Sequence, residues 1–229
     1  MNSVGSGGVG LENLPGKLTT ADGFVSPARN GARPADYGGG MEHGVGVHWT
    51  KSQPHREILM SWDHQILLFM AAHRSEGLDS GFRAVTWLGS LYVLAPLVVL
   101  LVAGLLYLQK RWEALVLVVG FGGAALWVHL AKALLARPRP ALVEPVIALP
   151  TDGSFPSAHT TQIVAFALCA VLIVRRLWPE WQFAALAVAA LLIVIVAASR
   201  VYLQVHYPSD VLGGFLLGIG WIALMRKIL

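Results

Sequence analysis

The residues of this sequence that could carry out chemistry gather in three short polar patches, each at the end of an otherwise apolar stretch. In chain order the patches comprise Lys132 with Arg139 and Pro140, then Pro156, Ser157, Ala158 and His159, then Ser199, Arg200, His206 and Asp210. Cations, imidazoles and a carboxylate are costly to place beside lipid, so such a group is a functional hypothesis by default. Their types suit the binding and cleavage of a phosphate group.

The first patch supplies two cations at the end of a predicted helix. Pro138 and Pro140 stop that helix shortly after Lys132, so Arg139 emerges in an extended loop. Arginine binds phosphate oxygens bidentately and stays charged, whereas lysine supplies a mobile point charge. Taken alone, the same two cations, together with Arg137, are better explained as anchors of the helix end to lipid headgroups.

The second patch has the composition of a helix start that binds an anion. Pro156 suits the first helical position, which would leave the amides of residues 157–159 without helical acceptors. Ser157 adds a hydroxyl, and His159 adds an acid or base whose ordinary pKa lies near neutrality. A proline-initiated helix that carries a histidine by chance is the structural alternative.

The third patch pairs a histidine with a carboxylate. Arg200 closes one predicted helix and Pro208 opens the next. His206 then lies just before the new helix and Asp210 lies in its first turn, where an acid suits the helix dipole. Asp210 could also hold one ring nitrogen of His206 and leave the other free to attack. The alternative makes Asp210 a capping residue and His206 an interfacial side chain.

The composition predicts an integral membrane protein. The 229 residues are 55% hydrophobic and only 13% charged, and the mean hydropathy is +0.61. Five apolar stretches are long enough to span a membrane, which takes roughly 20 mostly apolar residues. They cover about residues 82–108, 112–136, 157–176, 181–199 and 209–227. We therefore expect an all-α fold, a polytopic membrane helix bundle of about five transmembrane helices.

Two further segments precede these spans. Residues 1–50 are rich in Gly, Pro, Asn and Ser, which predicts a disordered tail, and they lack the basic start and apolar core of a cleaved leader. We place the membrane domain at residues 51–229. Within it, apolar residues recur at helical spacing over about residues 56–73, which predicts an amphipathic helix on the membrane surface. Its other faces carry the polar residues Arg56, Glu57, Asp63, His64 and Arg74.

The parity of five spans predicts where the patches meet. Consecutive spans place their ends on alternate faces, so all three patches fall on one face. The opposite face receives basic residues in short connections, which marks it as cytoplasmic. These residues are Lys110, Arg111, Arg175, Arg176, Arg226 and Lys227. We therefore expect a multi-pass protein of the plasma (inner) membrane whose polar site faces the periplasm or the cell exterior.

The ordered set Lys132-x6-Arg139-Pro140, Pro156-Ser157-x-His159 and Ser199-Arg200-x5-His206-x3-Asp210 resembles the three signature motifs of the type 2 phosphatidic acid phosphatase superfamily. That superfamily also contains the vanadium haloperoxidases. The resemblance covers residues from about 56 to the end, because bacterial lipid phosphatases of this superfamily share the five spans and the surface helix. Ala158 departs from the commonest motif, which has Gly there. Alanine is tolerated in a first helical turn, so we expect a slightly altered shape near the phosphate.

The resemblance implies a role for each residue. His206 would attack phosphorus in line and form a phosphohistidine, with Asp210 orienting its ring. His159 would protonate the leaving oxygen and later help to activate water. The equatorial oxygens would be held by Lys132, Arg139, Ser157, Ala158 through its amide, and Arg200. Because these cations take the part that metal ions play in many phosphoryl-transfer enzymes, we expect no metal and no cofactor.

The expected partners are membrane lipids and a lipid phosphate substrate. Undecaprenyl diphosphate, converted to undecaprenyl phosphate, is the leading candidate, while phosphatidylglycerol phosphate, phosphatidic acid and lipid A phosphate stay open. A haloperoxidase would share the pocket, but the apolar spans argue against it. An inert lipid or anion carrier would not need the His206 and Asp210 pair. The basic residues flank apolar helices, so we expect no nucleic-acid partner. Close packing at Gly213, Gly214, Gly218 and Gly220, within or between chains, leaves the oligomeric state open.

Overall fold

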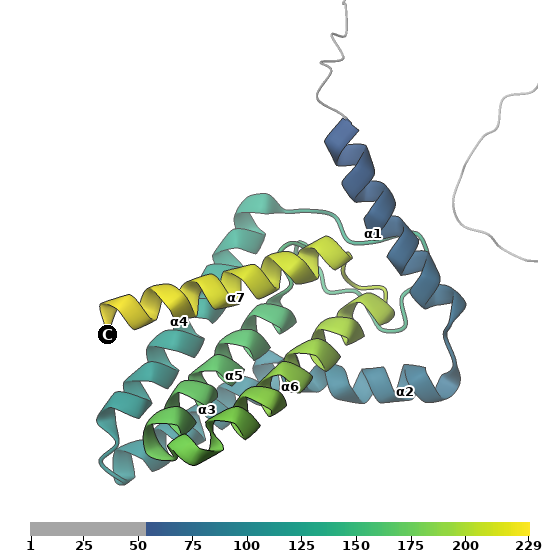
Figure 1. Ribbon diagram of the computed structural model, residues 1–229. Helices are drawn as coiled ribbons and strands as arrows, with labels where there is room; N and C mark the ends of the chain where they lie inside the picture. The colour runs from purple at the N-terminus through teal and green to yellow at the C-terminus, as the bar shows by residue number, and fades with distance from the viewer. Residues whose placement is uncertain (1–53) are drawn as a thin grey trace, which may run out of the picture. The chain divides into compact units, whose positions relative to one another are not determined.

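The computed structural model describes the backbone of residues 54–229 and the side chains from residue 62 onward. Over this range the chain forms seven α-helices and two short 3-10 turns, and no strand (Figure 1). In order these are α1 (Pro54–Ala72), α2 (Glu76–Val85), η1 (Thr86–Gly89), α3 (Leu91–Tyr107), α4 (Arg111–Leu135), α5 (Ala158–Leu177), η2 (Pro179–Trp181), α6 (Gln182–Tyr202) and α7 (Pro208–Ile228). The predicted all-α class is confirmed. The tail expected over residues 1–50 lies outside the described residues.

Four helical segments in the described range are long and apolar enough to cross a membrane: α4, α5, α6 together with η2, and α7. Their bounds agree with the last four predicted spans to within about three residues. A fifth span results if α2, η1 and α3 are counted together. The expected number of about five spans therefore depends on how this first segment crosses the membrane.

The first predicted span, residues 82–108, is a broken segment rather than one straight helix. The axis bends by 42° between the α2–η1 segment and α3. At the bend Ser90 adopts an extended conformation with ψ of 138°, and its hydroxyl accepts a hydrogen bond from the amide of Tyr92 at 3.3 Å. Ser90 is thus the N-cap of a new helix. Apolar residues continue on both sides of this serine, so hydropathy alone predicted a single span.

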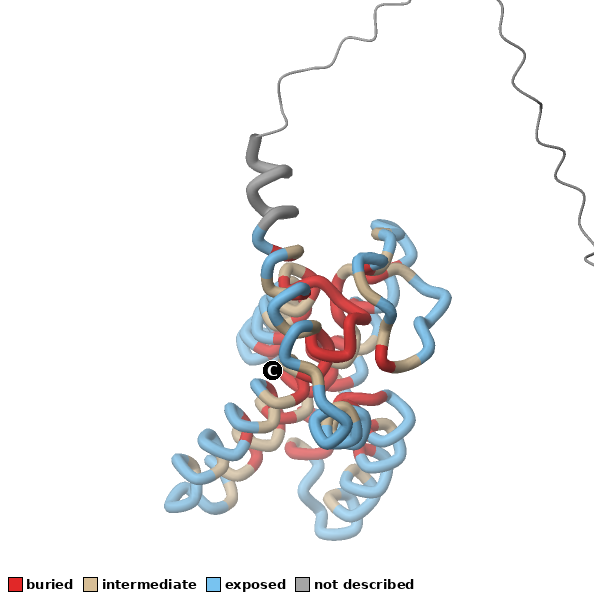
Figure 2. The backbone as a smooth tube through the Cα atoms, turned by 90° about the vertical axis from the view of Figure 1, so that its right-hand side faces the viewer, coloured by how far each residue is buried: buried red, intermediate tan, exposed pale blue. Residues whose placement is uncertain are grey.

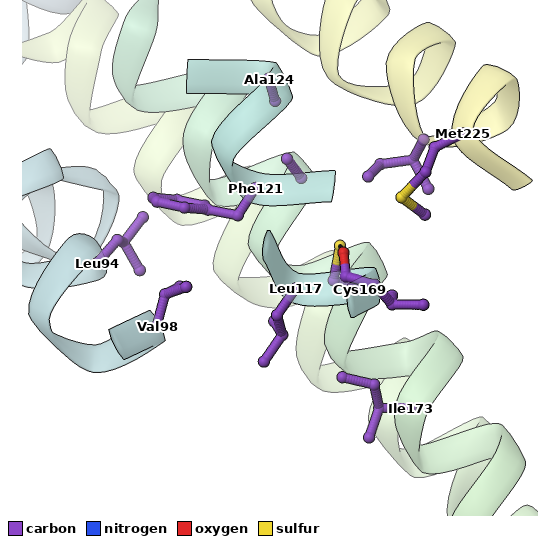
Figure 3. Packing of buried hydrophobic residues seen from close by; sticks show 11 residues of the cluster. Leu94, Val98, Leu117, Phe121, Ala124, Cys169, Ile173 and Met225 are labelled. Atoms are coloured by element: carbon purple, nitrogen blue, oxygen red, sulfur yellow. Dashed lines mark hydrogen bonds between the residues drawn. The ribbon is translucent and has the colours of Figure 1, made fainter. Parts of the chain in front are cut away.

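Helix α5 lies at the centre of the bundle and packs against α4, α6 and α7. The main apolar core joins α3, α4, α5 and α7, as Figure 3 shows. Its buried members include Leu94, Val98, Leu117, Phe121, Ala124, Cys169, Ile173 and Met225. A second cluster fills the space between α5 and α6. The outward faces of the helices remain exposed (Figure 2). Many of their exposed side chains are large and apolar, as lipid-facing surfaces require.

The N-terminal helix α1 packs against α6 and α7. Leu67 is completely buried there and contacts a cluster with Val201 and Tyr207, whereas Trp62 and Phe69 are exposed. The sequence placed Asp63 on a face of α1 other than the apolar one. In the structure Asp63 is buried, with 1% of its surface exposed, because it pairs with groups at the start of α7. The position of α1 on a membrane surface stays a prediction.

The two connections that carry the polar patches lie against each other. The amide of Val146, in the α4–α5 connection, donates a hydrogen bond to the carbonyl of Leu203, in the α6–α7 connection, at 3.2 Å. The amide of Ser157 donates to the carbonyl of Asp210 at 3.0 Å. These contacts join the α4–α5 connection to the end of α6, and the start of α5 to the start of α7. The parity of the spans predicted this meeting at one end of the bundle.

Candidate active site

The histidine and carboxylate of the third patch face each other at the start of α7. Helix α7 begins at Pro208 with Asp210 in its first turn, as predicted. Asp210 Oδ2 lies 3.4 Å from Nδ1 of His206 and also accepts a hydrogen bond from the amide of Tyr207 at 2.9 Å. The carboxylate therefore caps the helix and contacts the imidazole at the same time. The two roles that the sequence offered for Asp210, helix capping and orientation of His206, are therefore compatible in one conformation.

Arg139 of the first patch lies against the other side of the imidazole. Its Nη1 donates a hydrogen bond to the carbonyl of Val205 at 2.8 Å and lies 3.3 Å from Nε2 of His206. Helix α4 ends at Leu135, before the prolines, where Ala136 takes a left-handed conformation with φ of 40°. The loop that follows carries Arg139 back toward the α6–α7 connection. Arg139 and Asp210 thus enclose the ring of His206 from two elements far apart in sequence.

Asp152 bridges the two cations of the first patch, a role that no pattern in the sequence indicated. Its Oδ2 lies 3.0 Å from Nζ of the buried Lys132, and its Oδ1 lies 2.5 Å from Nη2 of Arg139. Lys132 also donates to the carbonyl of Gly153. Burial alone would raise the pKa of Asp152, but the hydrogen bonds from Arg139 and Lys132 outweigh it and hold this pKa below its ordinary value. An anionic group therefore lies between the two cations.

The second patch starts a helix, but two residues later than expected. Helix α5 begins at Ala158 with Ser157 as the N-cap, so Pro156 does not occupy the first helical position. The reason is a tertiary contact: the amide of Ser157 donates to the carbonyl of Asp210, which holds Ser157 in an extended conformation. The amide of Ser157 is therefore occupied. The amides of residues 158–160 form the first helical turn, where no helical acceptor exists.

Two threonine side chains in this first turn donate hydrogen bonds to Ser157. Ser157 is fully buried, its Oγ accepts a hydrogen bond from Thr160 Oγ1 at 3.0 Å, and its carbonyl accepts one from Thr161 Oγ1 at 3.0 Å. His159 lies beside the turn η1, where a β-carbon added to Gly89 would be only 3.0 Å from the carbonyl oxygen of His159. A glycine at the bend after α2 thus allows η1 to approach the start of α5.

Arg200 is a buried cation whose partners are neutral. Only 2% of its surface is exposed. Its Nη1 donates a hydrogen bond to Thr86 Oγ1 in η1 at 2.6 Å, and its Nε has no acceptor within the described part of the chain. A buried guanidinium with an unused donor is costly unless an anion binds to it. Arg200 adds a third cation to Lys132 and Arg139 near His206.

The electrostatic surroundings keep the imidazole of His206 neutral. Burial is the main cause that lowers the pKa of His206 well below its ordinary value, and the nearby charges of Arg200, Arg139 and Lys132 lower it further. A neutral ring whose Nδ1–H is directed at Asp210 carries its lone pair on Nε2, the nitrogen beside Arg139. This arrangement can present a nitrogen nucleophile to an anion held by the surrounding cations.

Two further residues were not assigned to the site from the sequence. Arg137 was interpreted only as an anchor to headgroups, and Asp63 only as part of a surface helix. In the structure Arg137 Nη1 lies 2.5 Å from Asp210 Oδ1, and its Nη2 lies 3.1 Å from Asp63 Oδ2. The position of Arg137 two residues before Arg139 was the one signal available in the sequence.

Comparison with known proteins identifies the family. Residues 113–229 match the model of the PAP2 superfamily. The chain belongs to the PAP2 superfamily. This PAP2 chain is 31% identical over 168 residues to phosphatidylglycerophosphatase B of Bacillus subtilis, a match that covers 72% of this chain and 82% of the relative. It is 35% identical over 141 residues to an undecaprenyl-diphosphatase of Sulfolobus acidocaldarius, covering 60% of this chain and 63% of that relative.

Solved structures agree with this assignment. A transmembrane PAP2-type phosphatidylglycerolphosphate phosphatase from Bacillus subtilis superimposes with a TM-score of 0.70 at 29% identity, covering 76% of this chain and 87% of that one. LpxE of Aquifex aeolicus superimposes with a TM-score of 0.58 at 25% identity and covers 71% of this chain and 93% of that one. Together with the apolar helices, these neighbours establish a multi-pass membrane protein of a family of membrane lipid phosphatases.

Proposed function

We propose that this PAP2 protein hydrolyses the phosphate ester or diphosphate of a membrane lipid through a phosphohistidine intermediate. The observation that carries the proposal is the environment of His206, a buried imidazole with Asp210 Oδ2 at 3.4 Å from Nδ1 and Arg139 Nη1 at 3.3 Å from Nε2. A carrier would need the cations but not an oriented nucleophile. The pairing of a histidine with an orienting carboxylate therefore favours catalysis over anion binding alone.

In the proposed first step Nε2 of His206 attacks phosphorus, and the bond from phosphorus to the lipid oxygen breaks. His159 gives its proton to that leaving oxygen. In the second step His159 accepts a proton from water, the hydroxide attacks the phosphohistidine, and inorganic phosphate leaves with His206 regenerated. Asp210 holds Nδ1–H throughout, so the imidazole keeps one orientation and the positive charge of the phosphorylated ring is stabilised.

The proposed phosphate site uses the cations and the start of α5. Lys132, Arg139 and Arg200 would bind the equatorial oxygens, with the hydroxyl of Ser157 and the amide of Ala158 in the first turn completing the set. The carboxylate of Asp152 now lies between Lys132 and Arg139, and a bound phosphate would take its place. Because three cations surround this position, we propose that hydrolysis needs no metal ion.

The lipid is proposed from the relatives, since the phosphate site is common to many lipids. Undecaprenyl diphosphate is the leading candidate, and the relative named undecaprenyl-diphosphatase from Sulfolobus acidocaldarius supports it. Phosphatidylglycerol phosphate is the second candidate, and a specific observation favours it: the relative named phosphatidylglycerophosphatase B matches 82% of its own length. Both lipids present a terminal phosphate at the depth of the headgroups.

The test is phosphate release by the purified full-length chain from a panel of four lipids, with and without a chelator. The panel contains undecaprenyl diphosphate, phosphatidylglycerol phosphate, phosphatidic acid and lipid A phosphate. We expect the highest kcat/KM with undecaprenyl diphosphate and unchanged rates in the chelator. A preference of tenfold or more for phosphatidylglycerol phosphate would select the second candidate. If the chelator abolished the activity and magnesium restored it, metal independence would be rejected. If none of the four lipids were hydrolysed, the proposed function would be rejected.

We also propose that the site opens to the periplasm or cell exterior of the plasma (inner) membrane. The support is the group of basic residues at the opposite ends of the helices, where Arg175, Arg176 and Arg226 line one surface cavity with Trp112. Cysteines placed at the exposed positions Ala148 and Glu180 test this proposal in intact cells. We expect an impermeant thiol reagent to label the first position and not the second. Labelling of the second position alone would reverse the orientation.

A further inference from the structure

Arg137 connects the N-terminal helix to the carboxylate that faces His206. Its Nη1 lies 2.5 Å from Asp210 Oδ1 and donates a hydrogen bond to Ser209 Oγ at 2.8 Å, while its Nη2 lies 3.1 Å from Asp63 Oδ2. The guanidinium carbon also lies 4.2 Å from the centre of the Tyr207 ring. Both terminal nitrogens are thus committed to protein groups, so Arg137 is placed to hold Asp210 rather than a phosphate.

Asp63 fixes the same helix start from the other side. Its Oδ1 accepts a hydrogen bond from the amide of Ser209 at 2.8 Å, and its Oδ2 accepts one from the Ser209 hydroxyl. Asp63 belongs to α1 and is buried at 1% exposure, whereas the side chain of Arg137 is 25% exposed. The more accessible arginine therefore depends on a buried carboxylate of α1 to keep one conformation.

Asp210 has a particular need for such a partner. Its side chain is completely buried. Its Oδ2 accepts a hydrogen bond from the amide of Tyr207 and lies beside the ring of His206. Its Oδ1 forms an ion pair with Arg137, and no other cation in the described range pairs with that oxygen. A buried carboxylate that loses its counter-charge is strongly destabilised in its ionised form. Removal of Arg137 would therefore change both the charge state and the direction of Asp210.

We propose that Asp63 and Arg137 form a positioning relay through which the docking of α1 sets the orientation of Asp210 and, through it, the reactivity of His206. The relay rests on the proposed phosphatase function. Neither residue touches the phosphate in this scheme. The relay should therefore affect the chemical step, which depends on His206, and leave the binding of the phosphate group unchanged, because Lys132, Arg139 and Arg200 are not part of it.

The test compares Asp63→Asn, Arg137→Gln, Arg137→Lys and the double variant Asp63→Asn with Arg137→Gln in the full-length protein. We expect kcat to fall about tenfold in Asp63→Asn and about a hundredfold in Arg137→Gln, with KM and the inhibition constant of orthovanadate unchanged. The Arg137→Lys variant should recover part of kcat, since lysine restores the positive charge but cannot pair with Asp63 and Asp210 through two separate nitrogens. The double variant should be slower than Arg137→Gln by much less than tenfold, because most of the effect of Asp63 passes through Arg137 and only its hydrogen bonds to Ser209 act directly.

The matched control is Asp79→Asn. Asp79 forms a comparable ion pair in the N-terminal part of the described chain, 3.2 Å from Arg74, and contacts none of the site residues. We expect its kcat to equal that of the wild type. Thermal unfolding of each variant with and without orthovanadate distinguishes lost positioning from lost folding.

Three results would overturn the relay: an unchanged kcat in Asp63→Asn, independent losses that multiply in the double variant, or losses confined to KM and orthovanadate inhibition. A wild type that hydrolyses none of the four lipids would instead reject the proposed function, and the relay with it. An active wild type whose Asp63→Asn variant is equally active would reject the relay alone.

Discussion

Replacement of His206 by alanine is expected to lower kcat by roughly four orders of magnitude or more, because the variant has no nitrogen to form the covalent intermediate. The cations around the site would still bind phosphate, so orthovanadate should still raise the unfolding temperature. Phosphate release from the preferred lipid measures the first effect. A short incubation with a lipid labelled in its terminal phosphate, followed by denaturation at alkaline pH, should yield labelled wild-type protein and unlabelled variant.

The control for this experiment is His73→Ala. His73 is exposed, and within the described residues its ring interacts with Phe69 of α1: Nδ1 lies 2.8 Å from the carbonyl of Phe69, and the two rings pack against each other. This variant should keep wild-type activity and labelling. If His206→Ala retained more than a tenth of the wild-type kcat, the nucleophile would have to be another group and the proposed mechanism would be wrong.

Replacement of Arg200 by methionine is expected to have opposite effects on activity and stability. The loss of one charged donor to the transition state should lower kcat/KM by roughly 10² to 10³. The guanidinium, however, is buried, and its Nε has no acceptor among the described residues. An apolar side chain of similar length removes that cost, so the unfolding temperature without ligand should stay equal or rise.

Orthovanadate gives this prediction a second measurement. It should stabilise the wild type against thermal unfolding and stabilise Arg200→Met much less, since the variant lacks one cation of the anion site. Arg83→Met is a suitable control, because Arg83 donates to the carbonyl of Val146 at 3.0 Å outside the phosphate site. Equal stabilisation of Arg200→Met and the wild type would remove Arg200 from the proposed phosphate site.

The apolar spans, and the end of the bundle at which each span begins and ends, could be predicted from the sequence because they depend on local composition and on the number of spans. Helices α4 to α7 lie close to their predicted bounds, and the parity argument correctly brought Arg139, Ser157 and Asp210 to one end of the bundle. The break before α3 was missed because a single serine caps the new helix there without any change in hydropathy. The start of α5 was misplaced by two residues because a contact with α7, not a local preference, sets the conformation of Ser157.

The candidate site divides in the same way. Residues such as His206, Asp210, Lys132 and Arg200 stood out because polar groups beside lipid are costly and few. Asp152 and Asp63 did not stand out, since acids in a loop or on an amphipathic helix are ordinary in sequence. Their importance comes from the cations that the fold places next to them.

The sequence by itself determined the membrane-spanning character, the helical class, the family motifs and the face on which the polar patches meet, because hydropathy, helix-terminating prolines and spacing act over short distances along the chain. Only the tertiary structure decided which partner each charge takes. Asp210 meets His206 within its own turn, but Arg137, Asp63 and Arg139 reach this place from other elements. Ion pairs within a few ångströms depend on how helices pack, and the sequence pattern does not specify that packing.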